Sequence, residues 1–109
     1  MESLRTEIWV AALIRRAQVA GAFATVSAKG DPDAGAVVVK VNFLDGRAQV
    51  YAPAWDGEGR RAWIDPLGAD APDAETRVDD YLRRRRERDP DLWVVEIEDR
   101  HGRHFIEDH

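Results

Sequence analysis

Apolar residues recur across residues 4–20 at the three-to-four-residue spacing that places side chains on one arc of an α-helix. Gly21 follows the last of them and predicts the end of this helix, because glycine readily adopts the left-handed conformation that terminates many helices. A second, narrower apolar strip lies beside two arginines, so the helix has either one wide buried face or a strip that contacts a partner chain. The main arc contains Trp9, Val10, Leu13, Ile14 and Ala17, and the strip contains Ile8, Ala12 and Val19, flanked by Arg15 and Arg16.

The alternation of apolar with polar residues predicts five strands further along the chain. Residues 36–44 give the clearest signal, because valines occupy one whole face and part of the other, a pattern typical of a central strand. Asp45-Gly46 then predicts a tight hairpin, since this dipeptide favours the turn that joins two paired strands. Successive strands with short connections predict a meander. The predicted strands are residues 22–28, 36–44, 47–54, 60–65 and 92–98.

A second helix is predicted over residues 74–88. Asp73 is its expected N-cap, and Asp89-Pro90 is expected to end it, because proline cannot continue a helix. Acidic residues lead and basic residues trail in this segment, which suits the helix dipole. The predicted inner stripe is Val78, Tyr81, Leu82 and Arg85, and the expected ion pairs are Asp79 with Arg83 and Asp80 with Arg84.

Together these elements predict a single α+β domain over residues 1–109. Its mostly antiparallel sheet of about five strands is covered by two helices, in the order α-β-β-β-β-α-β. The chain has 109 residues, 44% of them hydrophobic, and is long enough to bury a core of its own. The residues from His104 to the end are expected to form either a short strand at Phe105-Ile106 or a loose tail.

The chain has no cysteine, which excludes disulfides, thiolate zinc sites, iron–sulfur clusters and a cysteine nucleophile. Its N-terminus lacks the basic and apolar regions of a signal peptide, and no apolar run approaches the roughly 20 residues that span a bilayer. We therefore expect a cytoplasmic protein that makes no contact with membranes. The formal net charge of −5 argues against nucleic acid as a partner, since nucleic-acid binders usually show a positive footprint.

Three segments resemble, in their order and spacing, a family of small uncharacterised alphaproteobacterial proteins described only as a domain of unknown function. They are the stretch from Trp9 to Arg16, the Gly30-Asp31-Pro32-Asp33-Ala34-Gly35 turn that leads into Val37–Val41, and the Asp-Pro-Asp-Leu-Trp-Val-Val-Glu run at residues 89–96. The resemblance spans nearly the whole chain and implies a bacterial, cytoplasmic protein with one domain. It implies no activity, ligand or catalytic residue.

Asp31 and Asp33 are the most conspicuous polar residues outside the helices. Two carboxylates one residue apart at a tight turn suit a hard cation such as Mg²⁺ or Ca²⁺, although a calcium loop needs more oxygen ligands than this segment offers. Ordinary turn chemistry, in which an aspartate side chain accepts from the local backbone, is the simpler interpretation. A third interpretation is an exposed recognition loop, because loops on rigid scaffolds often bind partners.

Arg83–Arg86 and Arg88 form the most basic stretch, and Arg84 with Arg86 are its candidates for contacting phosphates. Four consecutive arginines spread around a helix axis, however, and acidic residues surround them. A solvated face with intrahelical ion pairs is the simpler interpretation.

Four tryptophans are many for a chain of this length. Trp9, Trp63 and Trp93 fit core positions. Trp55 follows a strand end beside a turn and is expected to be exposed, either as an interface anchor or as a lid over the edge of the core.

His101, His104 and His109 lie near acidic residues at the end of the chain, and histidine is a frequent metal ligand. Their spacing across a turn and their terminal position argue against a preorganised site. We therefore predict no metal-ligating residue, no cofactor and no catalytic residue.

The leading functional hypothesis is a non-catalytic binding or accessory module that acts through a protein partner or a homodimer, because the sequence offers no recognisable reaction chemistry. A nucleic-acid-associated protein is one alternative, and a small ligand- or metal-binding enzyme that uses the aspartates or the histidines is another. The predicted interaction surface comprises Asp31, Asp33, Trp55, Ile8, Ala12, Arg15, Arg16, Arg84 and Arg86.

Overall fold

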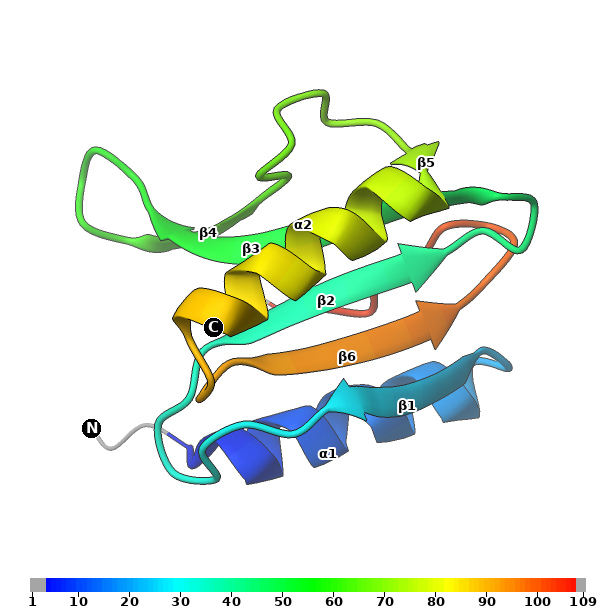
Figure 1. Cartoon of the computed structure of the whole chain (residues 1–109). Helices are drawn as coiled ribbons and strands as arrows, with labels where there is room; N and C mark the ends of the chain where they lie inside the picture. The colour runs from blue at the N-terminus through cyan, green and yellow to red at the C-terminus, as the bar shows by residue number, and fades with distance from the viewer. Residues whose placement is uncertain (1–3, 108–109) are drawn as a thin grey trace.

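Two helices and six strands make up the fold, which the computed structural model describes for residues 4–107 (Figure 1). The α+β class and the element order are confirmed, with one short strand, β5, added before the second helix. The other elements end within two residues of their predicted bounds. In chain order they are α1 (Thr6–Val19), β1 (Phe23–Ala28), β2 (Val37–Asn42), β3 (Arg47–Trp55), β4 (Arg61–Ile64), β5 (Asp73–Ala74), α2 (Glu75–Arg88) and β6 (Trp93–Glu98).

The sheet is mixed, with the strand order β1-β6-β2-β3-β4, and β5 pairs with β3. β2 and β6 run parallel, and the other pairs are antiparallel. The predicted meander is therefore wrong for β1, which pairs with β6 and not with β2. β2 and β6 take the central positions because they bury residues on both faces, and the long connection that makes them parallel contains α2.

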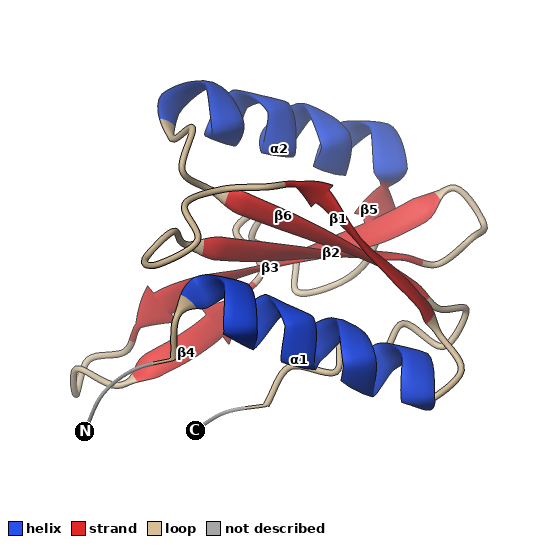
Figure 2. Cartoon of the chain, turned by 90° about the horizontal axis from the view of Figure 1, so that it is seen from below, coloured by secondary structure: helices blue, strands red, loops and turns tan. Residues whose placement is uncertain are grey.

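The two helices lie on opposite faces of the sheet (Figure 2). Leu13 of α1 packs in the core on one face with Val39 of β2, and Val78 of α2 packs in the core on the other face with Val38. Successive residues of a strand point to opposite faces, so β2 contributes to both cores. The central strands are thus enclosed by a helix on either side.

The predicted apolar arc of α1 is only partly buried. Val10, Leu13 and Ala17 are enclosed in the core, as predicted. Trp9 and Ile14 pack against the same core but remain partly exposed. Part of the Trp9 side chain is therefore exposed at the surface.

The start of α2 differs from the prediction. Asp73 lies in β5, and the N-cap is Ala74, which has no side-chain hydrogen bond. Asp73 accepts a hydrogen bond from the guanidinium of Arg77 instead. The predicted inner stripe contains two buried residues, Val78 and Leu82, and two partly buried ones, Tyr81 and Arg85.

The ion pairs on α2 also differ from the prediction. Arg84 Nε lies 3.1 Å from Asp80 Oδ2, which is one of the two expected pairs. Asp79 does not pair with Arg83; it accepts a hydrogen bond from Lys40 Nζ, 2.7 Å away on β2. A buried lysine on the sheet competes successfully for this carboxylate, because its charge has no water to solvate it.

The segment after β6 forms neither of the two expected structures. Phe105 and Ile106 make no strand; they pack against the core on the face that α1 covers. Arg16 holds this segment in place, because its Nε donates to the carbonyl of Phe105 at 3.1 Å. His109 lies outside the described residues.

Within residues 4–107, neither α1 nor α2 is long and apolar enough to cross a membrane.

Candidate binding groove

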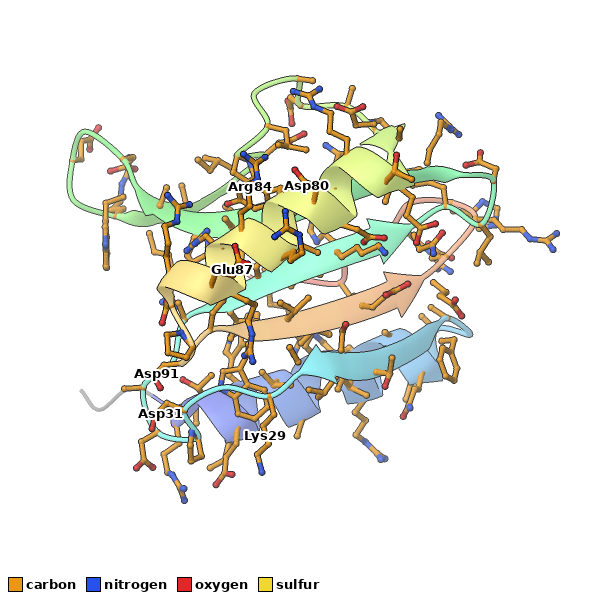
Figure 3. All side chains as sticks on the ribbon, viewed as in Figure 1. Lys29, Asp31, Asp80, Arg84, Glu87 and Asp91 are labelled. Atoms are coloured by element: carbon orange, nitrogen blue, oxygen red, sulfur yellow. The ribbon has the colours of Figure 1, made fainter. Side chains whose placement is uncertain are left out.

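The Gly30–Gly35 turn is locked against the start of β6. The backbone N–H of Asp31 donates to the carbonyl of Asp91 at 3.0 Å, and Trp93 Nε1 donates to the carbonyl of Asp31 at 2.7 Å. The Asp31 carboxylate accepts from the N–H of Ala34 at 2.8 Å, which is ordinary turn chemistry. Figure 3 shows Asp31 and Asp91 on neighbouring segments at this junction.

The same turn also caps α1. Arg5 is the N-cap residue and makes no capping side-chain hydrogen bond. The first N–H groups of a helix have no acceptor within the helix. Here Thr6 N–H donates to the carbonyl of Asp33 at 3.2 Å, and Glu7 N–H donates to the carbonyl of Pro32 at 3.0 Å. The Gly30–Gly35 turn thus orients the start of α1.

The two aspartates singled out in the sequence therefore have partners within the fold. The carboxylate of Asp31 closes its own turn, and Asp33 Oδ1 accepts from Arg5 Nε at 2.7 Å. Within residues 4–107, no group of three histidine, aspartate or glutamate side chains is arranged to hold a metal ion. The geometry of the turn supports the interpretation as ordinary turn chemistry.

An open groove of about 640 Å³ lies between this junction and the β3–β4 hairpin. The start of α1 and the hairpin lie at the same end of the molecule in Figure 2. Three of the four tryptophans line the groove, together with one proline and one arginine of the hairpin. We call it the tryptophan groove and define it by Trp9, Trp55, Trp63, Pro53 and Arg61.

The pairing of β3 with β4 sets the spacing of the groove residues. Trp55 lies directly opposite Arg61, and Pro53 lies directly opposite Trp63. These four residues alternate with others along their strands, so they share one face of the hairpin. Trp63 stacks on Trp9 of α1, with ring centroids 5.5 Å apart and an interplanar angle of 11°.

Trp55 is the most exposed aromatic residue of the groove, with 72% of its surface accessible. The sequence prediction of an exposed Trp55 is thus confirmed, whereas Trp9 and Trp63, expected in the core, are only partly buried. Trp93 is the core tryptophan, at 4% exposure. A large exposed indole on a paired strand is a rigid apolar surface, which is the usual form of an interface anchor.

The groove offers one free charge. The guanidinium of Arg61 makes no hydrogen bond and no ion pair with any residue of 4–107. The other polar groups of the groove are occupied: Asp33 binds Arg5, and the Thr6 hydroxyl donates to the carbonyl of Gly35 at 2.9 Å. The chain carries a net charge of −5, yet the unsatisfied charge at this site is positive.

The groove brings together two residues of the predicted interaction surface, Asp33 and Trp55. The α1 strip lies outside it. Ile8 and Arg15 are exposed and Ala12 is half-buried, so this strip is accessible. Arg16 is less accessible, because it binds the carbonyl of Phe105 and lies 3.4 Å from Glu107.

Arg84 and Arg86 have different surroundings. Arg84 pairs with Asp80 on the outer surface of α2, where Figure 3 labels both residues. Arg86 Nη1 donates to the backbone carbonyls of Leu92 at 2.7 Å, Lys29 at 3.2 Å and Pro90 at 3.3 Å. Arg86 therefore joins α2 to the residue before the Gly30–Gly35 turn and to the segment that precedes β6, and this role leaves its guanidinium poorly placed to contact phosphates.

A buried polar cluster lies beneath α2, and the sequence reasoning missed it. Lys40 is 4% exposed on β2, and its Nζ donates to Glu75 and Asp79 of α2 at 2.7 Å each. Glu96 of β6 lies 3.6 Å from the same nitrogen. Asn42 donates to Glu75 at 3.0 Å and to Glu96 at 3.2 Å. The sequence signal that could have revealed this cluster is the lysine within the run of valines in β2.

This cluster holds α2 on the sheet and does not activate the lysine. Burial alone would lower the pKa of Lys40, but hydrogen bonds to Asp79 and Glu75 and the charge of Glu96 raise it overall. A lysine nucleophile needs a lowered pKa, because only the neutral amine attacks. The arrangement is therefore that of a charged clamp between β2, β6 and α2.

The histidines are not assembled into a site within the described residues. His101 is exposed, and the His104 ring lies edge-on to Tyr51, with centroids 4.8 Å apart. Asp99 forms the ordered centre of this region: its carboxylate accepts from the backbone N–H and the guanidinium of Arg103. The turn after β6 is therefore held together by Asp99 and Arg103.

The fold is that of a small α+β protein with a mixed sheet between two helices. Its distinguishing feature is the Gly30–Gly35 turn, which is locked against residues 89–93. The chain belongs to the family described as protein of unknown function (DUF1491), whose model matches residues 4–107. This confirms the resemblance noted in the sequence. No protein with a curated description matches the chain.

Solved structures of related proteins share the fold. A crystal structure of a DUF1491 family protein from Caulobacter crescentus CB15 is 51% identical, with 97% of each chain covered and a TM-score of 0.88. An NMR structure of a DUF1491 family protein from the same organism is 50% identical, covers 99% of this chain and 96% of that one, and has a TM-score of 0.85. A protein from A. tumefaciens is 38% identical, covers 89% and 86%, and has a TM-score of 0.73.

Proposed function

We propose that this protein is a non-catalytic binding module that holds an extended peptide segment of a partner protein in the tryptophan groove. The observation that supports this function most strongly is Trp55, 72% exposed on the β3–β4 hairpin and directly opposite the free guanidinium of Arg61. Tryptophan and arginine are among the residue types most enriched at binding hot spots. We expect the module to act in the cytoplasm, as one folded domain.

The shape and lining of the groove favour a peptide over a small molecule. A small-molecule site encloses its ligand and places several polar groups toward it. The tryptophan groove is open, and within residues 4–107 no buried side-chain nitrogen or oxygen lacks a hydrogen-bond partner. Aromatic rings and a proline along an open groove suit extended peptides, above all proline-rich ones, whose backbone is already ordered before binding.

Binding agrees better than catalysis with the chemistry of the polar residues. Lys40 is held as a charged clamp, and the carboxylates of Asp31 and Asp33 are occupied by the turn and by Arg5. An enzyme needs a base, acid or nucleophile poised beside a substrate cavity. The tryptophan groove offers apolar surface and a single cation, which suffice for recognition.

An array of overlapping peptides from the proteins of an alphaproteobacterium tests this function. The probe is the purified full chain, and the matched variants are Trp55→Ala and Ile64→Ala. Ile64 is 47% exposed on the same hairpin but alternates with Trp63, so it points to the other face. We expect a set of peptides that binds the wild type and the Ile64 variant and is lost with Trp55→Ala. Equal binding by all three proteins, or no binding, would overturn the proposal.

A further inference from the structure

We infer that the tryptophan groove selects peptides in which a carboxylate lies two residues from a proline, and that Arg61 recognises the carboxylate. This inference rests on the proposed function, because it specifies the ligand of the same groove. The observations behind it are the cross-strand order of the hairpin residues and the distribution of charge around them.

The hairpin presents two different subsites in a fixed order. Pro53 and Trp63 form one cross-strand pair, and Trp63 stacks on Trp9, so this pair forms an apolar platform. Trp55 and Arg61 form the next pair on the same face, two residues along the strands. The guanidinium of Arg61 gives this pair a positive charge. A ligand that lies along the hairpin therefore meets an apolar surface first and a positive charge second.

Charge complementarity selects an acidic ligand. Arg61 lacks a partner within residues 4–107, whereas Asp33, the carboxylate at the opposite wall, is already paired with Arg5 at 2.7 Å. A guanidinium presents a planar fork of donors that matches a carboxylate in two parallel hydrogen bonds. A basic peptide would instead be repelled by Arg61, and Asp33 could not bind it because this carboxylate is already paired with Arg5.

The spacing follows from strand geometry. Two residues along a β-strand span about 6.6 Å, so the centres of the two subsites are separated by roughly that distance. Two residues of a polyproline II peptide span about 6.2 Å. A proline on the Trp63 platform thus places the side chain two positions away beside Arg61. Because the groove does not fix the chain direction, Pro-x-Glu and Glu-x-Pro are both candidates.

Titrations monitored by the indole N–H resonances of ¹⁵N-labelled protein test the inference. The probes are acetylated, amidated alanine-based octapeptides that contain Pro-x-Glu or Glu-x-Pro, the same peptides with lysine in place of glutamate, and peptides with the glutamate moved four residues away. Octathymidylate, a single-stranded DNA, is added as a separate probe. The proteins are the wild type, Arg61→Glu, and Arg100→Glu as a control that changes the net charge equally. Arg100 is exposed beyond the end of β6 and does not line the groove.

We expect the wild type and Arg100→Glu to bind a glutamate peptide about two- to fivefold more tightly than its lysine counterpart, the range that corresponds to the strength of an exposed ion pair. Arg61→Glu should reverse this order, and the four-residue spacing should lose the preference. Equal affinity for glutamate and lysine peptides, or equal effects of the Arg61 and Arg100 variants, would overturn the inference while the groove still binds peptide. If no peptide shifts the Trp55 resonance, or if only octathymidylate does, the proposed function itself fails.

Discussion

The indole rings of Trp9 and Trp63 are stacked, with their centroids 5.5 Å apart and their planes 11° from parallel, and so connect α1 directly to β4. α1 otherwise packs mainly on β1 and β6, which lie toward the opposite edge of the sheet from β4. The stack holds two of the residues that line the tryptophan groove against each other. It gives the apolar platform a fixed position relative to Trp55 and Arg61.

Removal of the stack should destabilise the fold and widen the groove. Trp63→Ala deletes a half-buried indole and is expected to lower the free energy of unfolding by about 2 kcal/mol, less than for a fully buried tryptophan. Trp63→Phe keeps an aromatic face and should cost about half as much. Urea unfolding measures both. Trp55→Ala is the control, because this side chain is 72% exposed, and a comparable loss in that variant would contradict the account.

The Lys40 clamp should contribute more to stability than any other ion pair described here. Lys40→Met leaves the carboxylates of Glu75 and Glu96 without their cation beneath α2 and should cost about 2–4 kcal/mol in urea unfolding. The other lysine of the chain supplies the control, since Lys29 is exposed and Lys29→Met should change stability by about 0.5 kcal/mol or less. Equal stability of the two variants would show that the clamp is dispensable.

The pKa of Lys40 also sets a pH range for this contribution. Folding raises this pKa above its ordinary value of 10.5, so the stabilisation is fully present below pH 10.5 and is lost only as the pH rises beyond it. Between pH 6 and pH 9, the difference between wild type and Lys40→Met should therefore stay constant.

The junction between the Gly30–Gly35 turn and residues 89–93 should not tolerate a side chain at Gly30. A Cβ there would lie 2.0 Å from the carbonyl oxygen of Asp91 and 2.7 Å from Cδ1 of Trp93. Gly30→Ala must therefore displace backbone and is expected to cost about 2–3 kcal/mol, with a lower thermal midpoint. Gly57→Ala is the matched control, because its Cβ would meet nothing within 4 Å. Equal midpoints would mean that the two segments are not in contact.

Asp99 should make the stability depend on pH in the acid range. Hydrogen bonds from Arg103 outweigh the effect of burial and hold the pKa of Asp99 at about 2, below its ordinary 3.8. The contribution, about 1–2 kcal/mol, is therefore complete above pH 4 and is lost as the pH falls toward 2. The stability difference between wild type and Asp99→Asn should fall at pH 2.5 to about a third of its value at pH 6. A difference that does not change with pH would contradict this role.

The sequence predicted what depends on local patterns and failed where distant segments meet. The alternating valines of β2 and the Asp45-Gly46 turn placed β2 and β3 correctly as a paired hairpin. The position of β6 between β1 and β2 was wrong, because a local rule for short connections cannot anticipate a parallel pair whose strands are separated by three other strands and a helix.

The candidate site shows the same limit. Trp9, Trp55 and Trp63 come from three separate elements, and only the exposure of Trp55 beside a turn was visible in the sequence. Arg84 and Arg86 are near neighbours in one basic run, yet one pairs on the helix surface and the other donates to three backbone carbonyls, those of Lys29, Pro90 and Leu92. Nothing in their local sequence distinguishes them.

The most direct test of the central claim is an NMR titration of the wild-type chain with the Pro-x-Glu octapeptide and, separately, with the Glu-x-Pro octapeptide, observed at the four tryptophan indole resonances. Three of these indoles line the groove, and Trp93 is an internal reference, because its Nε1 is hydrogen-bonded to Asp31 at the locked junction. The account predicts saturable shifts of Trp55, Trp63 and Trp9, with Trp93 unchanged. No shift in any of the three, or shifts of all four together, would contradict the proposal that the tryptophan groove binds peptides.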